Sequence, residues 1–155
     1  MIGQFLWASS DDGEAEAPPA PGEKAARVLL IEDDEIDAGL VRRRLAGEAV
    51  EIVHARFAGD GIRRLGAGAF DVVILDLNLP DSWASETLKT ALDAAGNVPI
   101  IAVSGNELSI HSGRRQTFPS QFLTFVPKDK ILHPYFGKYV VFVAALADPA
   151  PFVPA

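Results

Sequence analysis

The sequence contains no cysteine, and this absence narrows the chemistry open to the chain. Disulfide bonds, thiol nucleophiles and thiolate metal sites are all excluded, and the composition is compatible with a reducing compartment. No apolar run approaches the roughly 18 residues that a membrane-spanning helix needs. The opening segment MIGQFLW has no basic residue and too short an apolar part for a signal peptide. We therefore expect a cytoplasmic protein with no membrane partner.

The sequence also contains fewer basic than acidic residues. The 14 lysines and arginines face 21 aspartates and glutamates, which gives a formal net charge of −7. This balance argues against a general affinity for nucleic acid, so no nucleic-acid partner is expected. The chain has 155 residues, of which 48% are hydrophobic, so it is long enough for one domain with a substantial core.

The two ends of the chain differ in composition from the middle. Residues 1–26 form an arm that is acidic and rich in Ala, Pro and Gly from residue 8 onward, which predicts flexibility because little of it can be buried. Its apolar residues Ile2, Phe5, Leu6 and Trp7 allow two interpretations, a disordered terminus or a short apolar plug for a groove. Residues 148–155 form a Pro-rich tail. The domain is expected between them, over 27–147.

Within this domain, apolar runs alternate with segments of helical character. The expected strands are 27–31, 50–55, 71–76, 98–104 and 121–126. Strands that are apolar on both faces and alternate with helices are typical of a parallel sheet with helices on each side. With right-handed crossovers, five such units fit a doubly wound α/β fold whose five-stranded parallel sheet has the order 2-1-3-4-5.

The segments after these strands are the expected helices, at 34–47, 59–68, 85–94, 106–118 and 138–147. In the first of them, one face is expected to carry Ile36, Leu40, Val41 and Leu45. The fourth is expected to be irregular, because Gly113 interrupts it and Pro119 closes it.

Polar residues follow the strands at the edge where such folds bind ligands. Glu32 and Asp33 end the first strand, Asp76 ends the third, Ser104 ends the fourth and Lys128 follows the fifth. Three carboxylates at one edge repel each other unless a divalent cation or the lysine neutralises them. Hard oxygen ligands favour Mg²⁺, which completes its shell with water and phosphoryl oxygens. The pattern predicts a site that holds a metal and accepts a phosphoryl group.

Each of these residues also has a plainer interpretation. Asp33 and Asp34 could cap a helix, Asp76 could be a turn residue before NLP, and Ser104 before Gly105 could belong to an ordinary turn. Lys128 could be a solvated surface charge. Their joint occurrence at these spacings argues against coincidence. The histidines His54, His111 and His133 have no metal-binding spacing and are expected to be structural or exposed.

Four segments, VLLIEDDE, FDVVILDLNLPDS, IIAVSGN and FVPKD, carry a family resemblance. In this order and spacing, the chain from Arg27 to Ala147 resembles the receiver domain of bacterial two-component response regulators, of the stand-alone type with a flavodoxin-like fold. No effector domain is expected, so output would run through protein contacts. The resemblance implies a histidine kinase or histidine phosphotransfer protein as phosphoryl donor and an unknown downstream protein as target.

The resemblance also implies a role for each site residue. Asp76 would accept the phosphoryl group from a phosphohistidine. Asp33, Asp76 and the backbone carbonyl of Asn78 would bind Mg²⁺ directly, and Glu32 would act through water. Lys128 would pair with Asp76 and then with the phosphoryl oxygens, while Ser104 and Phe125 would act as the switch pair. Such a domain catalyses its own phosphorylation and dephosphorylation but turns over no external substrate.

The chain departs from the family pattern at three places. Ala84 stands where glycine is usual, and Asp129 stands where proline commonly follows the lysine, so a cis peptide there cannot be assumed. Residues 109–122 lack the firm fourth helix and the Gly-Ala turn that the family usually has before its fifth strand. This region lies on the face that usually reports phosphorylation. Two alternatives therefore stay open: a receiver-like interaction module that does not cycle phosphate, and a Mg²⁺-dependent phosphatase of the haloacid dehalogenase type. The second would need an acid where this chain has Asn78.

Overall fold

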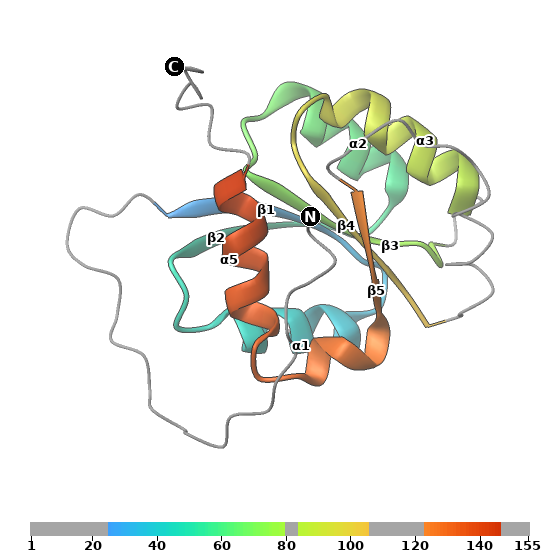
Figure 1. Ribbon diagram of the computed structural model, residues 1–155. Coiled ribbons are helices and arrows are strands. Elements are labelled where there is room, and N and C mark those ends of the chain that lie inside the picture. The colour runs from blue at the N-terminus through green and yellow to red at the C-terminus, as the bar shows by residue number, and fades with distance from the viewer. Residues whose placement is uncertain (1–24, 80–83, 106–122, 147–155) are drawn as a thin grey trace, which may run out of the picture.

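Five parallel strands form one sheet in the order β2-β1-β3-β4-β5, as predicted (Figure 1). The computed structural model describes residues 25–79, 84–105 and 123–146. The strand bounds are β1 Ala26–Ile31, β2 Val50–Ala55, β3 Val72–Asp76, β4 Ile100–Ser104 and β5 Leu123–Pro127. Each neighbouring pair is parallel. All five carboxyl ends therefore point to one edge of the sheet.

The helices lie in two layers, one on each face of the sheet (Figure 1). Their bounds are α1 Glu35–Leu45, α2 Ala58–Ala67, α3 Ala84–Ala95 and α5 Phe136–Leu146, with a 3₁₀ helix η2 at Lys128–Leu132. Helices α1 and α5 cover one face, and α2 and α3 cover the other. The irregular helix predicted over 106–118 lies outside the described residues.

The alternation of side chains along the strands divides the core into two halves. On β1, Val28 and Leu30 pack with α1 and α5, whereas Leu29 and Ile31 pack with α2 and α3. Successive side chains on a strand point to opposite faces, so a strand covered on both sides needs apolar residues at every position. Strands β3 and β4 are buried throughout for the same reason. The strand ends are thus held by a rigid, fully packed support.

Two glycines allow helices to approach their neighbours closely. A Cβ atom at Gly137 of α5 would collide with the backbone carbonyl oxygen of Arg44 at the end of α1. A Cβ atom at Gly61 of α2 would collide with the side chain of Ile31 on β1. Neither position could carry a larger residue without movement of the helix or of its neighbour.

The predicted inward face of α1 was wrong at Ile36, whose side chain is 76% exposed. The buried residues of this helix are Ala38, Val41 and Leu45, and Leu40 is partly buried. A helix turns by about 100° per residue, so Ile36 lies about 200° around the axis from Ala38. The small Ala38 marks the buried face, and apolar size alone pointed to the wrong residue.

The predicted arm over 1–26 lies outside the described residues except for its last two, and β1 begins at Ala26. The predicted tail over 148–155 lies wholly outside them. These two boundaries stay predictions. Among the described helices, none combines the length and the apolar character needed to cross a bilayer.

Candidate functional site

The register of the sheet brings the candidate residues to the same level. Ile31 of β1 pairs with Leu75 of β3, so the next residues, Glu32 and Asp76, lie side by side beyond that pair. Asp76 in turn pairs with Val103 of β4. Ser104 follows Val103 and pairs with Pro127, which precedes Lys128. The four strands β1, β3, β4 and β5 thus deliver their polar residues to one edge.

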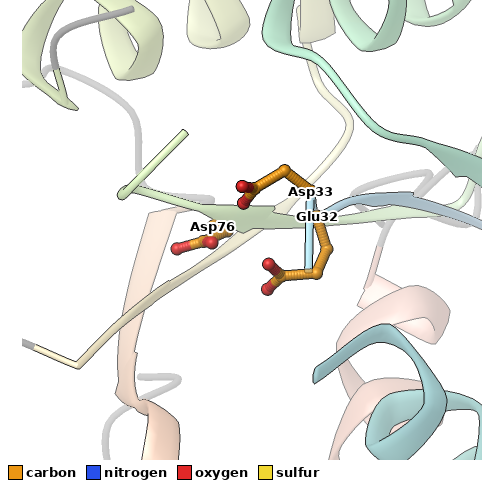
Figure 2. Close-up of side chains that lie close together, drawn as sticks. All are labelled: Glu32, Asp33 and Asp76. Atoms are coloured by element: carbon orange, nitrogen blue, oxygen red, sulfur yellow. The ribbon is translucent and has the colours of Figure 1, made fainter. Parts of the chain in front are cut away.

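Glu32, Asp33 and Asp76 form an acidic cluster (Figure 2). Each of them offers a carboxylate oxygen, and these three oxygens lie within 4.8 Å of one another. Glu32 is only 3% exposed and Asp76 only 2%, whereas Asp33 is half-buried. Such carboxylate oxygens are the ligands that Mg²⁺ prefers. The donor set therefore fits a hard divalent cation.

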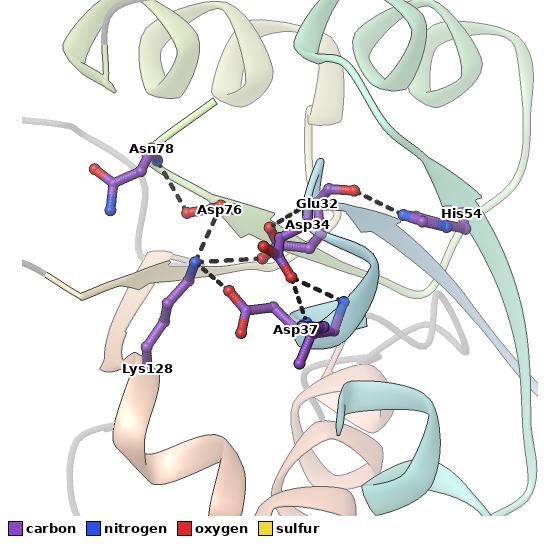
Figure 3. Close-up of polar contacts among 8 residues, drawn as sticks. Glu32, Asp34, Asp37, His54, Asp76, Asn78 and Lys128 are labelled. Carbon is purple, nitrogen blue, oxygen red and sulfur yellow. Dashed lines mark hydrogen bonds and ion pairs between the residues drawn. The ribbon is translucent and has the colours of Figure 1, made fainter. Parts of the chain in front are cut away.

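The side chain of Lys128, which follows β5, points toward the acidic cluster (Figure 3). Its Nζ lies 2.7 Å from Asp37 Oδ2, 3.3 Å from Asp76 Oδ2 and 3.7 Å from Glu32 Oε2. Partial burial acts to lower the pKa of the Lys128 ammonium, but the hydrogen bond to Asp37 and the charges of the acids raise that pKa above its ordinary value. The lysine therefore stays charged and neutralises part of the cluster.

The Lys128 ammonium does not offset all the effects that act on the pKa of Glu32. Burial, a hydrogen bond with Asp76 and the charge of Asp76 raise the pKa of Glu32 to about 8. The backbone N–H of Asp34, which donates to Glu32 Oε1 at 3.1 Å, and the charge of Lys128 oppose this shift without cancelling it. Burial beside Asp76 therefore favours the neutral form of the Glu32 carboxyl.

Asp76 is also held by the turn that follows it. The backbone N–H of Asn78 donates to Asp76 Oδ1 at 2.9 Å. Aspartate commonly accepts a hydrogen bond from the backbone two residues later, which closes a local turn. Asp76 therefore both closes this turn and lies buried at the end of β3. Its Oδ1 accepts from the N–H of Asn78, and its Oδ2 contacts Lys128. The assignment of the Asn78 carbonyl as a ligand stays a prediction.

Asp34 serves the helix instead of the acidic cluster. Its Oδ1 accepts hydrogen bonds from the backbone N–H groups of Ile36 and Asp37, at 2.8 and 3.0 Å, and caps α1. These two hydrogen bonds, that from Asp37 first, lower the pKa of the Asp34 carboxyl. Helix capping therefore explains Asp34 but not Asp33, whose carboxylate faces Asp76 (Figure 2).

His54 of β2 anchors the loop that carries the acids. Its Nε2 lies 2.7 Å from the carbonyl oxygen of Glu32 (Figure 3). Its Nδ1 lies 2.8 Å from the guanidinium of Arg42. A carbonyl only accepts and a guanidinium only donates, so Nε2 carries the proton and Nδ1 accepts. The expectation that His54 is structural agrees with these contacts.

Ser104 and Phe125 occupy different environments. Ser104 is buried at the end of β4, while Phe125 is half-buried on β5 and packs with the core on the α2 and α3 side. Their roles as a switch pair stay predictions. The described residues contain no cis peptide bond, so the bond between Lys128 and Asp129 is trans.

Sequence reasoning missed Asp37, which makes the shortest contact with Lys128. The available signal was its spacing. Asp37 lies one turn beyond Asp33 and Asp34, and residues three or four apart share a face of a helix. The first turn of α1 therefore carries a further carboxylate toward the strand edge.

Comparison with known proteins agrees with this geometry. The sequence model described as the response regulator receiver domain matches residues 28–128, which include Glu32, Asp33, Asp76 and Lys128. The chain belongs to the response regulator receiver domain family. The sequence-based recognition of the family is thus confirmed.

Two curated proteins match part of the chain in sequence. The receiver domain is 35% identical over 80 residues to the cell cycle transcriptional regulator CtrA of Caulobacter vibrioides, which is 52% of this chain and 35% of that protein. It is also 35% identical over 79 residues to the cell cycle response regulator CtrA of Brucella abortus, covering 51% of this chain and 34% of the relative. The matched part spans about a third of the length of these curated relatives.

Solved structures support the fold. A CheY-like receiver domain protein from Methanospirillum hungatei is 23% identical with a TM-score of 0.57, and the match covers 75% of this chain and 94% of that one. A putative response regulator from Chloroflexus aurantiacus is 18% identical with a TM-score of 0.64, covering 80% and 98%. The receiver domain of the hybrid histidine kinase CckA is 21% identical with a TM-score of 0.56, covering 79% and 98%. At these identities the similarity shows the fold alone.

Proposed function

We propose that this receiver domain accepts a phosphoryl group from a phosphohistidine onto Asp76, with Mg²⁺, and signals through protein contacts. The observation that carries the proposal is the buried Asp76 carboxylate between the acidic cluster and the Lys128 ammonium. A buried carboxylate with a single strand-end structural role would not need two further acids and a lysine around it. With a divalent cation bound at the acids, the cation and the Lys128 ammonium would together favour a reaction that brings additional negative charge to Asp76.

The transfer needs few covalent steps. An Asp76 oxygen attacks the phosphorus atom of the phosphohistidine, a P–O bond forms as the P–N bond breaks, and the departing imidazole takes up a proton. The product is an acyl phosphate, which water later cleaves to restore the carboxylate and release inorganic phosphate. A carboxylate nucleophile thus divides one transfer into two steps. No external substrate is turned over.

The residues of the acidic cluster would hold the metal. Asp33 and Asp76 would provide direct carboxylate ligands, Glu32 would act through water, and the backbone carbonyl of Asn78 would be a further protein ligand. Bound Mg²⁺ supplies positive charge for the phosphoryl oxygens. Lys128 supplies a second positive charge from the η2 side, and Ser104 donates a hydrogen bond to the phosphoryl group.

The expected partners come from membership of the receiver domain family. The donor would be a histidine kinase or a histidine phosphotransfer protein, because receiver domains take their phosphoryl group from a phosphohistidine. One structural neighbour is itself the receiver domain of a hybrid histidine kinase. The target is a downstream protein, and the site of action is the cytoplasm. The switch would run through Ser104 and Phe125.

The test uses acetyl phosphate as donor. The full chain is incubated with acetyl phosphate and Mg²⁺, and its intact mass is measured. We expect the mass to rise by one phosphoryl group, and we expect Asp76→Asn to prevent the rise. An equal gain in the variant would place the modified residue elsewhere. No gain in either protein, with the fold intact, would favour the alternative of an interaction module that does not cycle phosphate. Steady turnover of small phosphate esters would favour the phosphatase alternative.

A further inference from the structure

Lys128 contacts more acids than a lysine serving Asp76 alone would need. Its shortest contact, 2.7 Å, goes to Asp37 of α1 and not to Asp76, which lies 3.3 Å away. Glu32 is a third acid within ion-pair distance, at 3.7 Å. An ammonium has three N–H donors, and three carboxylates surround this one. A phosphoryl group arriving at Asp76 would therefore meet a lysine that is already shared.

The local structure of α1 explains why Asp37 can reach the lysine. Asp37 is the third helical residue, and in a capping box the acid at this position bonds back to the N–H of the cap residue. In this protein the N–H of the cap residue Asp34 donates to Glu32 Oε1 instead. The Asp37 carboxylate is thus left to contact Lys128, so its role extends beyond the helix.

We propose that Asp37 is a positioning residue that holds the Lys128 ammonium toward α1 in the resting domain and releases it when Asp76 is phosphorylated. This inference rests on the proposed function. Of the three acids, Asp37 has the most exposed side chain, 30% against 3% for Glu32 and 2% for Asp76. Water can replace the ammonium at an exposed carboxylate at the lowest desolvation cost. Asp37 is therefore the acid that gives up the lysine.

Asp37 consequently slows phosphorylation in two ways. It competes with the phosphoryl oxygens for the ammonium, and its negative charge repels a dianionic donor. Asp37→Asn keeps the shape of the side chain but removes the charge. Removal of one negative charge a few Å away in a partly solvated site should make phosphorylation of the Asp37→Asn variant about threefold to tenfold faster.

The experiment measures the rate of phosphorylation by acetyl phosphate in the full chain with Mg²⁺. The Asp37→Asn variant should react faster, Asp37→Glu should restore a rate near that of the natural sequence, and the gain should shrink at high salt because exposed charges are screened. Glu35→Gln is the matched control, since Glu35 lies in the same helical turn but pairs with Arg56 at 3.5 Å. An unchanged or slower Asp37→Asn, or an equal gain in Glu35→Gln, would overturn the inference.

A second measurement separates this inference from the proposed function. The ¹H–¹⁵N signal of the Lys128 ammonium, assigned by its loss in Lys128→Arg, reports the Asp37 contact without any phosphoryl donor. We expect Asp37→Asn to shift this signal and to speed its exchange with water, and Glu35→Gln to leave it in place. If the natural chain takes no phosphoryl group, the proposed function fails while this signal still tests the contact. A signal that Asp37→Asn leaves unmoved would show that Asp37 does not hold the lysine.

Discussion

Asp33 and Asp34 are neighbours in the sequence, yet their carboxylates serve opposite sides of the turn between β1 and α1. The Asp34 carboxylate accepts two backbone N–H groups of the helix, and the Asp33 carboxylate faces Asp76. A capping residue and a metal-binding residue are thus adjacent. The difference can be measured, because the two substitutions should affect different properties.

Asp33→Ala should weaken Mg²⁺ binding at least tenfold, on the order of what loss of one direct ligand costs a weakly held cation. Asp34→Ala should leave Mg²⁺ affinity nearly unchanged and lower the melting temperature, because the helix cap is lost. Isothermal titration and thermal unfolding of both variants provide the comparison. Equal losses of Mg²⁺ affinity would contradict the assignment of Asp33 as a ligand.

Two glycines, one tightly packed and one with open space beside it, form a second test. Gly137→Ala should lower the free energy of unfolding by about 1–3 kcal/mol, because the new methyl group would press on the backbone of Arg44. Gly39→Ala, also in a helix, meets no atom within 4 Å and should be neutral or stabilising by about 0.5–1 kcal/mol. Urea unfolding of the two variants measures both values. A tolerated Gly137→Ala would mean that α5 can shift relative to α1.

The raised pKa of Glu32 predicts a pH dependence of the metal-free protein. Folding raises the pKa of Glu32 from 4.5 to about 8, so the protonated carboxyl favours the folded state. This stabilisation is complete below pH 4.5 and is lost as the pH rises through about 8. In the presence of a chelator, the contribution of Glu32 to stability should therefore fall across this window, and Glu32→Gln should remove it. Urea unfolding of the natural chain and of Glu32→Gln at several pH values gives the two curves, and parallel curves would contradict a raised pKa of Glu32 in the folded protein.

The switch pair predicts a separation of chemistry from response. Ser104→Ala should leave phosphorylation of Asp76 detectable, because nucleophile, lysine and acids remain. It should reduce the change in the Phe125 ring signals that follows addition of acetyl phosphate and Mg²⁺, since the hydrogen bond from the serine to the charged phosphoryl group is absent. Aromatic NMR spectra of the two proteins test this. A full Phe125 response in Ser104→Ala would assign the switch to other residues.

The sheet could be predicted because its information is local in the sequence. Runs such as Val72–Leu75 are apolar at every position, and only a strand covered on both faces needs that pattern. The acids followed from the same reasoning, since parallel strands end at one edge. The strand order required the additional rule for crossover handedness.

The rotation of α1 about its axis could not be predicted in the same way. It accounts for two errors, the inward placement of Ile36 and the omission of Asp37. The buried face is marked by Ala38, which carries little apolar signal, so Ile36 was placed inward. Asp37 was overlooked because its partner Lys128 lies 91 residues away, and no local pattern joins them. The contact depends on the exact rotation of the helix, which packing decides. That packing includes the close approach of α5 to the end of α1 at Gly137.

The segment from Glu32 to Asp37 joins the acidic cluster at the end of β1 to the first turn of α1. The backbone N–H of Asp34 donates to Glu32, which follows β1, and the Asp37 carboxylate contacts Lys128, which follows β5. A displacement of the first turn of α1 would lengthen the contact between Asp37 and Lys128, because Asp37 belongs to the helix whereas Asp76 belongs to β3. The position of α1 therefore helps to set how much of the Lys128 charge is presented to Asp76.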